Sequence, residues 1–338
     1  MLKPSLSYRI KHVPLRAGLA LAMSLAAIAG APPAAAQSFP SHTVTLVVPF
    51  PPGGGTDTGA RILAQELGKR WGQSVIVENK GGAAGLIGAT LVAQARPDGY
   101  TLLLGNIGTQ SINPSLYSKM PYDPDKAFAP VSLLAELPLA VMINPAKLPQ
   151  VKTIGDFIRY AKSHQGQLSY GSSGAGGGPH LATEMFKDQA GLNIQHIPYR
   201  GGGPAVSALL AGDVQLTMMT VLEASGHIKA GDMLALAVTG ARRVAALPDV
   251  PTLSESVLPG FNSISWIGLL APAGTPAAIV DKISTDMRAI VADKDFAAHI
   301  AALGGVPRAD TPQEFARMIA DDRGRYAQII RSHNIKVE

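Results

Sequence analysis

Hydrophobic and polar positions along this chain repeat one arrangement: a short β-branched apolar run, a cluster of glycines, and a segment with helical spacing. The first copy reads VVPFPPGGGTDTGA over residues 47–60 and predicts a strand, a tight loop and a helix start. Glycine N–H groups can approach a bound group closely because no Cβ intervenes, and the first turn of a helix favours an anion. The stretch therefore predicts an anion-binding loop, with Thr56 or Asp57 as the helix cap. A βα turn with no binding role can have the same composition. The repetition of the strand, glycine cluster and helix along the chain favours a role in binding.

Strand and helix patterns alternate through the rest of the chain. Strands are predicted near residues 43–48, 74–77, 100–104, 131–134, 139–143, 168–170, 194–198, 214–219 and 234–238, and helices over 61–70, 86–95, 153–163, 180–190, 205–211, 277–292 and 312–331, with Thr153 as one cap. A polar loop is expected over 105–110 and a surface connection over 113–130. This alternation is typical of an α/β fold in which the loops gather at the carboxyl ends of parallel strands. Two lobes with facing glycine loops would form a cleft suited to a small carboxylate.

The first 36 residues have a different character. Residues 1–16 carry four basic side chains and no acid, residues 17–30 are apolar, and three alanines precede Gln37. This is typical of a secretory signal peptide cleaved after Ala36, and the apolar run is too short to span a bilayer comfortably. Removing four positive charges lowers the net charge from +5 to +1, so charge gives no support to nucleic-acid binding. Without cysteine, neither a disulfide framework nor a lipoprotein anchor is available.

The sequence lacks the common cofactor and metal motifs. The phosphate loop GxxxxGK[ST] and GxGxxG are missing, and the histidines show no HExxH spacing, so neither a cofactor nor a metal is predicted. One enzymatic alternative stays open: GSSGA at 171–175 resembles a nucleophile elbow between a strand and a helix, with Ala175 where the second glycine would stand. A triad could draw only loosely on Asp213 or Asp232 and His227 or His299. A secreted α/β serine hydrolase is therefore the alternative to a binding protein.

Several motifs occur together over nearly all of the chain after residue 36. They are VPFPPGGGTD (48–57), VENKGGAAGLIGA (77–89), ARPDGYTLLLG (95–105), INPSLY (112–117), GSSGAGGGPHLATEMF (171–186), PYRGGGPA (198–205), LALAVTGARR (234–243), LPDVPTLSE (247–255) and GLLAPAGTP (268–276). In this order they resemble the Bug, or TctC-like, family, the periplasmic solute receptors of tripartite tricarboxylate transporters.

The resemblance implies a non-catalytic receptor with the two-lobe periplasmic-binding-protein fold, type II-like, in which each lobe is a mostly parallel sheet flanked by helices. Lobe 1 would comprise residues 37–138 and 265–338, and lobe 2 residues 139–264. The ligand would be a small organic acid: a di- or tricarboxylate, an aromatic carboxylate or an amino acid. The partner would be the membrane permease of such a transporter, and the protein would act as a periplasmic monomer without nucleic acid.

The resemblance also implies a set of ligand-binding residues between the lobes. The first lobe would supply the loop Pro52, Gly53, Gly54, Gly55, Thr56 and Asp57 together with Asn106 and Thr109, and the second lobe Ser172, Ser173, His180, Gly201, Gly202, Gly203, Pro204 and Thr220. Asp57 is equally compatible with a helix cap alone, and His180 with a neutral structural role at a helix start. Ser207 stands where many relatives have aspartate.

Overall fold

The computed structural model describes residues 39–332 and residue 335. The chain divides into two units, Met1–Ser41 and His42–Glu338, and the fold is that of the second unit. The predicted signal peptide, residues 1–36, lies outside the described residues.

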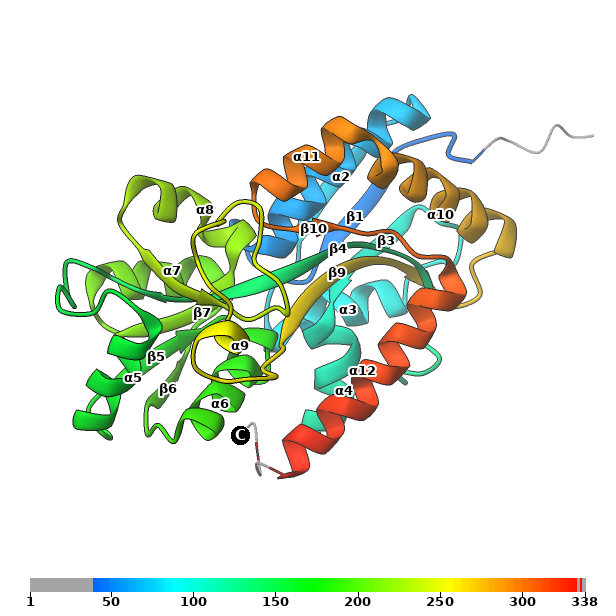
Figure 1. Ribbon diagram of the computed structural model, residues 1–338. Helices are drawn as coiled ribbons and strands as arrows, with labels where there is room; N and C mark the ends of the chain where they lie inside the picture. Colours follow the sequence, from blue (N-terminus) through cyan, green and yellow to red (C-terminus); the bar gives the residue numbers. More distant parts are fainter. Residues whose placement is uncertain (1–38, 333–334, 336–338) are drawn as a thin grey trace, which may run out of the picture. The chain divides into compact units, whose positions relative to one another are not determined.

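Ten strands of the described residues are joined by hydrogen bonds (Figure 1). Eight of them follow the path β2-β1-β3-β9-β4-β7-β5-β6, and β8 and β10 pair with β4 beside this path. The path divides into two sheets that share β4. The first sheet contains β1 (Val44–Val48), β2 (Val75–Asn79), β3 (Thr101–Asn106), β4 (Phe128–Ile143), β9 (Ile264–Pro272) and β10 (Val306–Pro307). The second contains the end of β4 with β5 (Ser169–Ser172), β6 (Gln195–Pro198), β7 (Leu216–Thr220) and β8 (Leu234–Val238).

Both sheets are mixed. The pairs β1–β2, β1–β3, β5–β6 and β5–β7 are parallel, as expected for strand–glycine loop–helix units, while the pairings of β4 and β9 are antiparallel. The predicted α/β fold class is confirmed, with antiparallel strands added where the two sheets meet.

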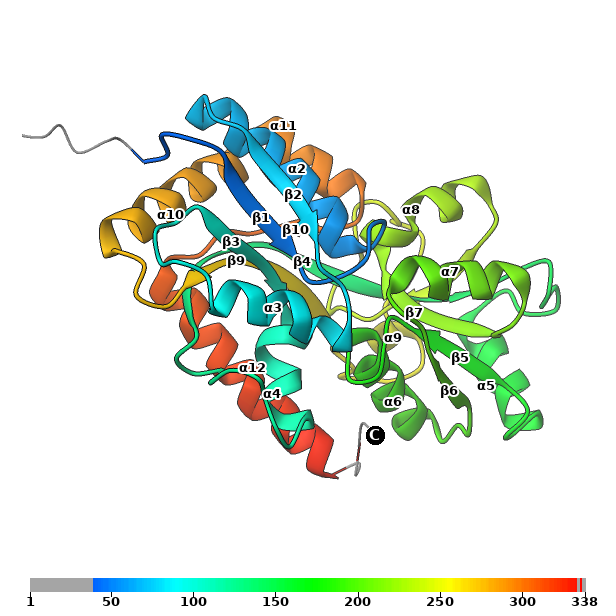
Figure 2. The same cartoon turned by 180° about the vertical axis from the view of Figure 1, so that it is seen from behind.

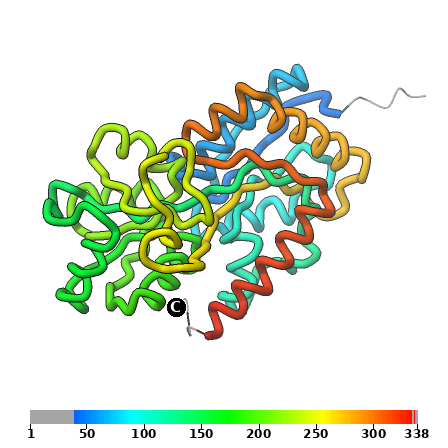
Figure 3. The backbone as a smooth tube through the Cα atoms, in the orientation of Figure 1, coloured from blue at the N-terminus to red at the C-terminus, as the bar shows by residue number. Residues whose placement is uncertain are grey.

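The helices flank the sheets (Figures 1 and 2). Those of the first sheet are α2 (Gly55–Trp71), α3 (Leu86–Ala93), α4 (Asn113–Leu116), α10 (Ala277–Ala292), α11 (Lys294–Ala302) and α12 (Pro312–Ser332), with a 3₁₀ turn at Ala83–Gly85 and a π turn at Gly108–Ile112. Those of the second sheet are α5 (Ile154–Ser163), α6 (Gly178–Ala190), α7 (Gly202–Ala211), α8 (Val221–Ala230) and α9 (Leu253–Ser256). The C-terminal helices return to the N-terminal segments, α10 against α2 and α12 against α4 (Figure 3).

Strand β4 joins the two sheets. It pairs with β9 as far as Pro138 opposite Ile264, and with β7 from Leu139 onward. Proline has no N–H to donate, so Pro138 suits the point where the strand changes partners. Beyond it, alternate side chains enter two cores: Leu139, Val141 and Ile143 on one face of the second sheet, and Ala140 and Met142 on the other.

Four sequence predictions about the elements need correction. The strand pair at 131–134 and 139–143 is the single strand β4, because pairing to β9 continues through residues 135–138, where Glu136 and Pro138 interrupt the apolar pattern. The polar loop at 105–110 and part of the surface connection after it are strand end, buried π turn and short helix. Helices α6 and α7 begin earlier than predicted, at Gly178 and Gly202, and α8, α9 and α11 were not predicted. Helix α2 begins at Gly55 with Gly54 as its N-cap, so neither Thr56 nor Asp57 occupies the cap position.

Candidate functional site

The loop after β1 is held in shape by Asp57. Gly53 has φ +92°, in the left-handed region that favours glycine, and its N–H donates to Asp57 Oδ2 at 3.0 Å. Asp57 also accepts from Arg61 Nε at 3.0 Å and from Asn79 Nδ2 at 2.9 Å. Burial opposes ionisation, but the hydrogen bonds from Arg61, Gly53 and Asn79 hold the pKa of Asp57 below its ordinary value. Because both carboxylate oxygens bond to the protein itself, Asp57 fixes the loop.

The second glycine loop, between β5 and α6, rests on a column of stacked rings. The centroids of His180 and His196 lie 4.0 Å apart, and Tyr170 stacks on His196 at 4.8 Å. His180 Nδ1 accepts the Gly176 N–H at 2.9 Å, and His196 Nε2 lies 2.6 Å from Ser172 Oγ. These two imidazoles therefore set the course of the loop from Ser172 to the start of α6.

Both imidazoles are neutral at ordinary pH. Burial lowers the pKa of His180 to about 4 and that of His196 to about 3. His180 is thus a neutral hydrogen-bonding group, one of the two roles left open for it. His196 has no motif around it, and only its place on β6 beside β5 brings it to Ser172.

The Ser172–His196 pair resembles the nucleophile and base of a serine hydrolase, but its surroundings are unsuited to that chemistry. Ser172 is fully buried, so a substrate carbonyl cannot reach its Oγ. A general base works best with a pKa near the operating pH, and that of His196 is far lower. The pair positions the loop.

The loop before α7 meets the first sheet's loop. Gly201 has φ +120°, and a methyl group there would lie 3.3 Å from Pro51. At the start of α2, a methyl group on Gly55 would lie 2.7 Å from Thr220 Oγ1. Thr220 is the N-cap of α8, and its Oγ1 accepts the Glu223 N–H at 3.2 Å. Thr220 is therefore buried at this junction as a helix cap.

Glu223 is a residue of this junction that the sequence analysis missed. A methyl group added to Gly202 would lie 1.5 Å from Glu223 Oε1, so the carboxyl group rests directly against α7. The side chain is partly exposed as a whole, but Oε1 is buried and has no hydrogen-bond partner. Burial raises the pKa of Glu223 to about 7, against the opposing effects of the Gly55 N–H and the Thr220 hydroxyl. An acid three residues after a threonine was the available signal, and it predicts only a capping box.

A cavity of about 710 Å³ lies between loops of the two sheets. The first-sheet side is lined by Phe50, Pro51, Pro52, Asn79, Gly81–Gly85 and Tyr117, and the second-sheet side by Ser173, Gly174, Ala175, Pro198, Tyr199, Arg200 and Gly201. Its size suits a small organic molecule. Of the predicted binding residues, Pro52, Ser173 and Gly201 line this cavity.

The other predicted residues lie around the cavity without lining it. Asn106 and Thr109 bond to each other across the turn that follows β3, and Ser172 and His180 are buried beneath their loop. Pro204 is exposed on the first turn of α7. The remaining residues, Gly53, Gly54, Gly55, Thr56, Asp57, Gly202, Gly203 and Thr220, form the helix starts next to the cavity or the junction behind it.

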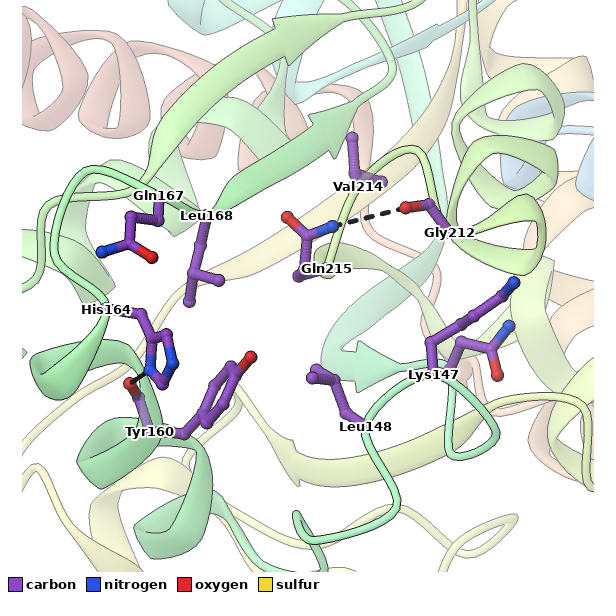
Figure 4. A pocket seen from close by; sticks show the side chains of 10 residues that line it. Lys147, Leu148, Tyr160, His164, Gln167, Leu168, Gly212, Val214 and Gln215 are labelled. Atoms are coloured by element: carbon purple, nitrogen blue, oxygen red, sulfur yellow. Dashed lines mark hydrogen bonds between the residues drawn. The ribbon is translucent and has the colours of Figure 1, made fainter.

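A separate cavity of about 360 Å³ lies in the second sheet's half alone (Figure 4). Lys147, Tyr160, His164 and Gln215 surround it, and Gln215 Nε2 donates to Gly212 O at 3.3 Å. It lies beside Leu168, where β5 is about to start, whereas ligands of open α/β sheets bind beyond the carboxyl ends of the strands. The larger cavity is therefore the better candidate.

Within the described residues, no helix is long and apolar enough to cross a membrane, and no three histidine or acidic side chains gather in a way that could hold a metal ion.

Comparison with known proteins identifies the class. Residues 59–335 match the family described as "Tripartite tricarboxylate transporter family receptor". The chain belongs to this TctC family of periplasmic solute-binding receptors, which are not enzymes.

Individual relatives are similar over most of their length. Protein BugT of Bordetella pertussis is 34% identical over 309 residues, 91% of this chain and 94% of BugT. An R. palustris protein solved with adipate is 35% identical with a TM-score of 0.86, covering 88% of this chain and 99% of that one. MatC from Rhodopseudomonas palustris with bound malate is 34% identical with a TM-score of 0.80, covering 86% and 100%.

Proposed function

We propose that this protein is a periplasmic receptor that captures a small dicarboxylate between two lobes and delivers it to the permease of a tripartite tricarboxylate-type transporter. The observation that carries the proposal is the 710 Å³ cavity, because loops from both sheets line it and helix starts surround it. Helix N-termini favour anions, and a carboxylate is buried cheaply only where several donors meet it. The relatives solved with adipate and malate support a dicarboxylate as the ligand.

The lobes of the receptor correspond to the two sheets. Residues 37–138 with 265–338 form lobe 1, residues 139–264 form lobe 2, and the signal peptide is removed after Ala36. The hinge lies where β4 passes from β9 to β7. A ligand drives closure only through contacts that the closed state makes better, and contacts from both lobes provide that difference. The protein acts as a monomer.

The test is a thermal-shift and calorimetric titration of residues 37–338 with adipate, malate and citrate after unfolding and refolding to remove carried-over ligand. A ligand at about a hundred times its dissociation constant adds roughly 2.7 kcal/mol of stability. Saturable binding by a dicarboxylate is expected, and absence of binding by all three acids contradicts the proposed substrate class.

Two matched variants locate the site. Ser173→Tyr fills the cavity from the second lobe and is expected to weaken binding strongly. Ser207→Tyr makes the same change at an exposed position of α7 outside the cavity and should bind as the wild type does. Equal affinities in the two variants would place the ligand elsewhere.

A further inference from the structure

Glu223 departs from a pattern that this chain follows elsewhere. In a capping box, the acid at the third helical position bonds back to the N-cap N–H while the N-cap side chain accepts the acid's N–H. Helices α5 and α9 have this reciprocal pair, Thr153 with Asp156 and Thr252 with Glu255. In α8, Thr220 accepts the Glu223 N–H, but the Glu223 carboxyl group does not bond back to the Thr220 N–H and lies instead against Gly202 of α7.

The carboxyl group lies where three helices begin. It rests against Gly202, the first residue of α7, and Oε1 would be 3.7 Å from a methyl group on Gly54, the N-cap of α2. The third helix is its own, α8. Helix starts present N–H groups without intrahelical partners and a partial positive charge. The protein's own carboxyl group thus occupies a position that would otherwise attract an anion.

We propose that Glu223 determines the specificity of the cleft. A ligand carboxylate bound at the starts of α2 and α7 shares the N–H donors there with the Glu223 carboxyl group, and binding therefore takes up one proton from solvent. The inference rests on the proposed function and deepens it. It follows that the receptor selects acids in which the end that meets Glu223 donates a hydrogen bond. If that end is a second carboxylate, it binds only when a proton is held between it and Glu223.

The charged groups around Glu223 do not relieve this competition. On α2, Asp57 is already bonded to Gly53, Arg61 and Asn79, and α7 has no titratable side chain. On α8, His227 pairs with Asp232 at 3.6 Å. No salt bridge within residues 39–332 includes Glu223, although Arg200 lines the neighbouring cavity.

Two carboxylates that share a poorly solvated site cannot both ionise. Oε1 has no partner in the described part of the chain, so it is the atom available for the shared proton. Burial raises the pKa of Glu223 to about 7, so the free receptor carries the proton below that pH and must acquire it on binding above. Affinity for a dicarboxylate should fall about tenfold for each pH unit above 7 and be level below 6.

The experiment is calorimetry of residues 37–338 with adipate and with malate between pH 5.5 and 8.5, in buffers of different ionisation enthalpy. Wild type should take up close to one proton at pH 8.5 and almost none at pH 5.5. Glu223→Gln keeps the shape and removes the titration, so it should show no uptake and level affinity. Glu66→Gln, on the exposed face of α2, should match wild type. Equal uptake in wild type and Glu223→Gln overturns the inference; Glu223→Ser supplies the comparison if the glutamine variant does not fold.

A ligand-free arm separates this inference from the proposed function. The melting temperature of Glu223→Gln should exceed that of wild type by more at pH 8.5 than at pH 5.5, because only wild type must bury an ionised carboxylate. If adipate and malate bind no variant, the proposed substrate class fails while this difference still tests the position of Glu223. A difference that does not change with pH overturns the inference.

Discussion

Adding one methyl group at Gly202 tests the junction between the helix starts. Gly202 begins α7, and its φ lies outside the left-handed region, so alanine fits the backbone without strain. The new methyl group would lie 1.5 Å from Glu223 Oε1 and 2.6 Å from Oε2, which forces the carboxyl group to move. The displaced carboxyl group then loses its interaction with the Gly55 N–H, an interaction that the glycine at position 202 permits in the wild type.

The expected cost follows from that displacement and is measured at pH 5.5, where Glu223 carries its proton and does not compete with the ligand. Moving a buried carboxyl group off its donor costs about 1–3 kcal/mol, which corresponds to roughly 5- to 150-fold in the dissociation constant if binding requires the closed junction. Isothermal titration of Gly202→Ala with adipate or malate measures it. Gly203→Ala is the matched control, because a methyl group there has no neighbour within 4 Å.

A second substitution identifies the cause. Truncating Glu223 removes the atoms that the methyl group strikes, so Gly202→Ala in a Glu223→Ala background should cost much less than in wild type. This makes a double-mutant cycle with a clear interaction energy. If Gly202→Ala weakens binding no more than Gly203→Ala does, or equally in both backgrounds, the contact between Gly202 and Glu223 has no role in binding.

Three further predictions concern the framework of the site. Asp57→Ala leaves the Gly53 N–H without its acceptor and should lower the free energy of unfolding by about 1–3 kcal/mol in a denaturant titration. Since the pKa of Asp57 is lowered in the folded protein, this difference between variant and wild type should be present at neutral pH and shrink in acid. A difference that stays constant with pH would refute it. Gly268→Ala places a methyl group 2.3 Å from the buried Phe315 ring and should cost about 1–3 kcal/mol, which Phe315→Leu should partly restore; full stability in the single variant would contradict this packing. The imidazole NMR signals of His180 and His196 should not titrate between pH 5 and 8. The free energy of unfolding should fall as the pH drops below 6.5, because these histidines take up protons in the unfolded chain but not when buried in the folded one. A titration midpoint near 6.5 for either ring would show that the ring is solvated.

The family and much of the local structure could be predicted from the sequence. The clusters at Gly53, Gly81, Gly174 and Gly201 mark βα loops because local backbone freedom and the absence of a side chain are properties of the residue itself. Thr153 was predicted as a helix cap from another local property, a side-chain oxygen that can accept an N–H of the first helical turn, and the structure confirms it. These signals are local, and they were sufficient for the α/β class and the motif order.

Tertiary structure alone decided the contacts between distant segments. Strand β4 is continuous because β9, more than a hundred residues later, supplies its partner through the segment that contains Glu136 and Pro138. His196 reaches Ser172 only because β6 lies beside β5. Glu223 has the sequence context of a capping box, yet its carboxyl group lies against Gly202 because α7 and α2 converge there. Spacing along a chain specifies the period of an element, whereas the partner across a sheet or between helix ends depends on how the whole chain packs.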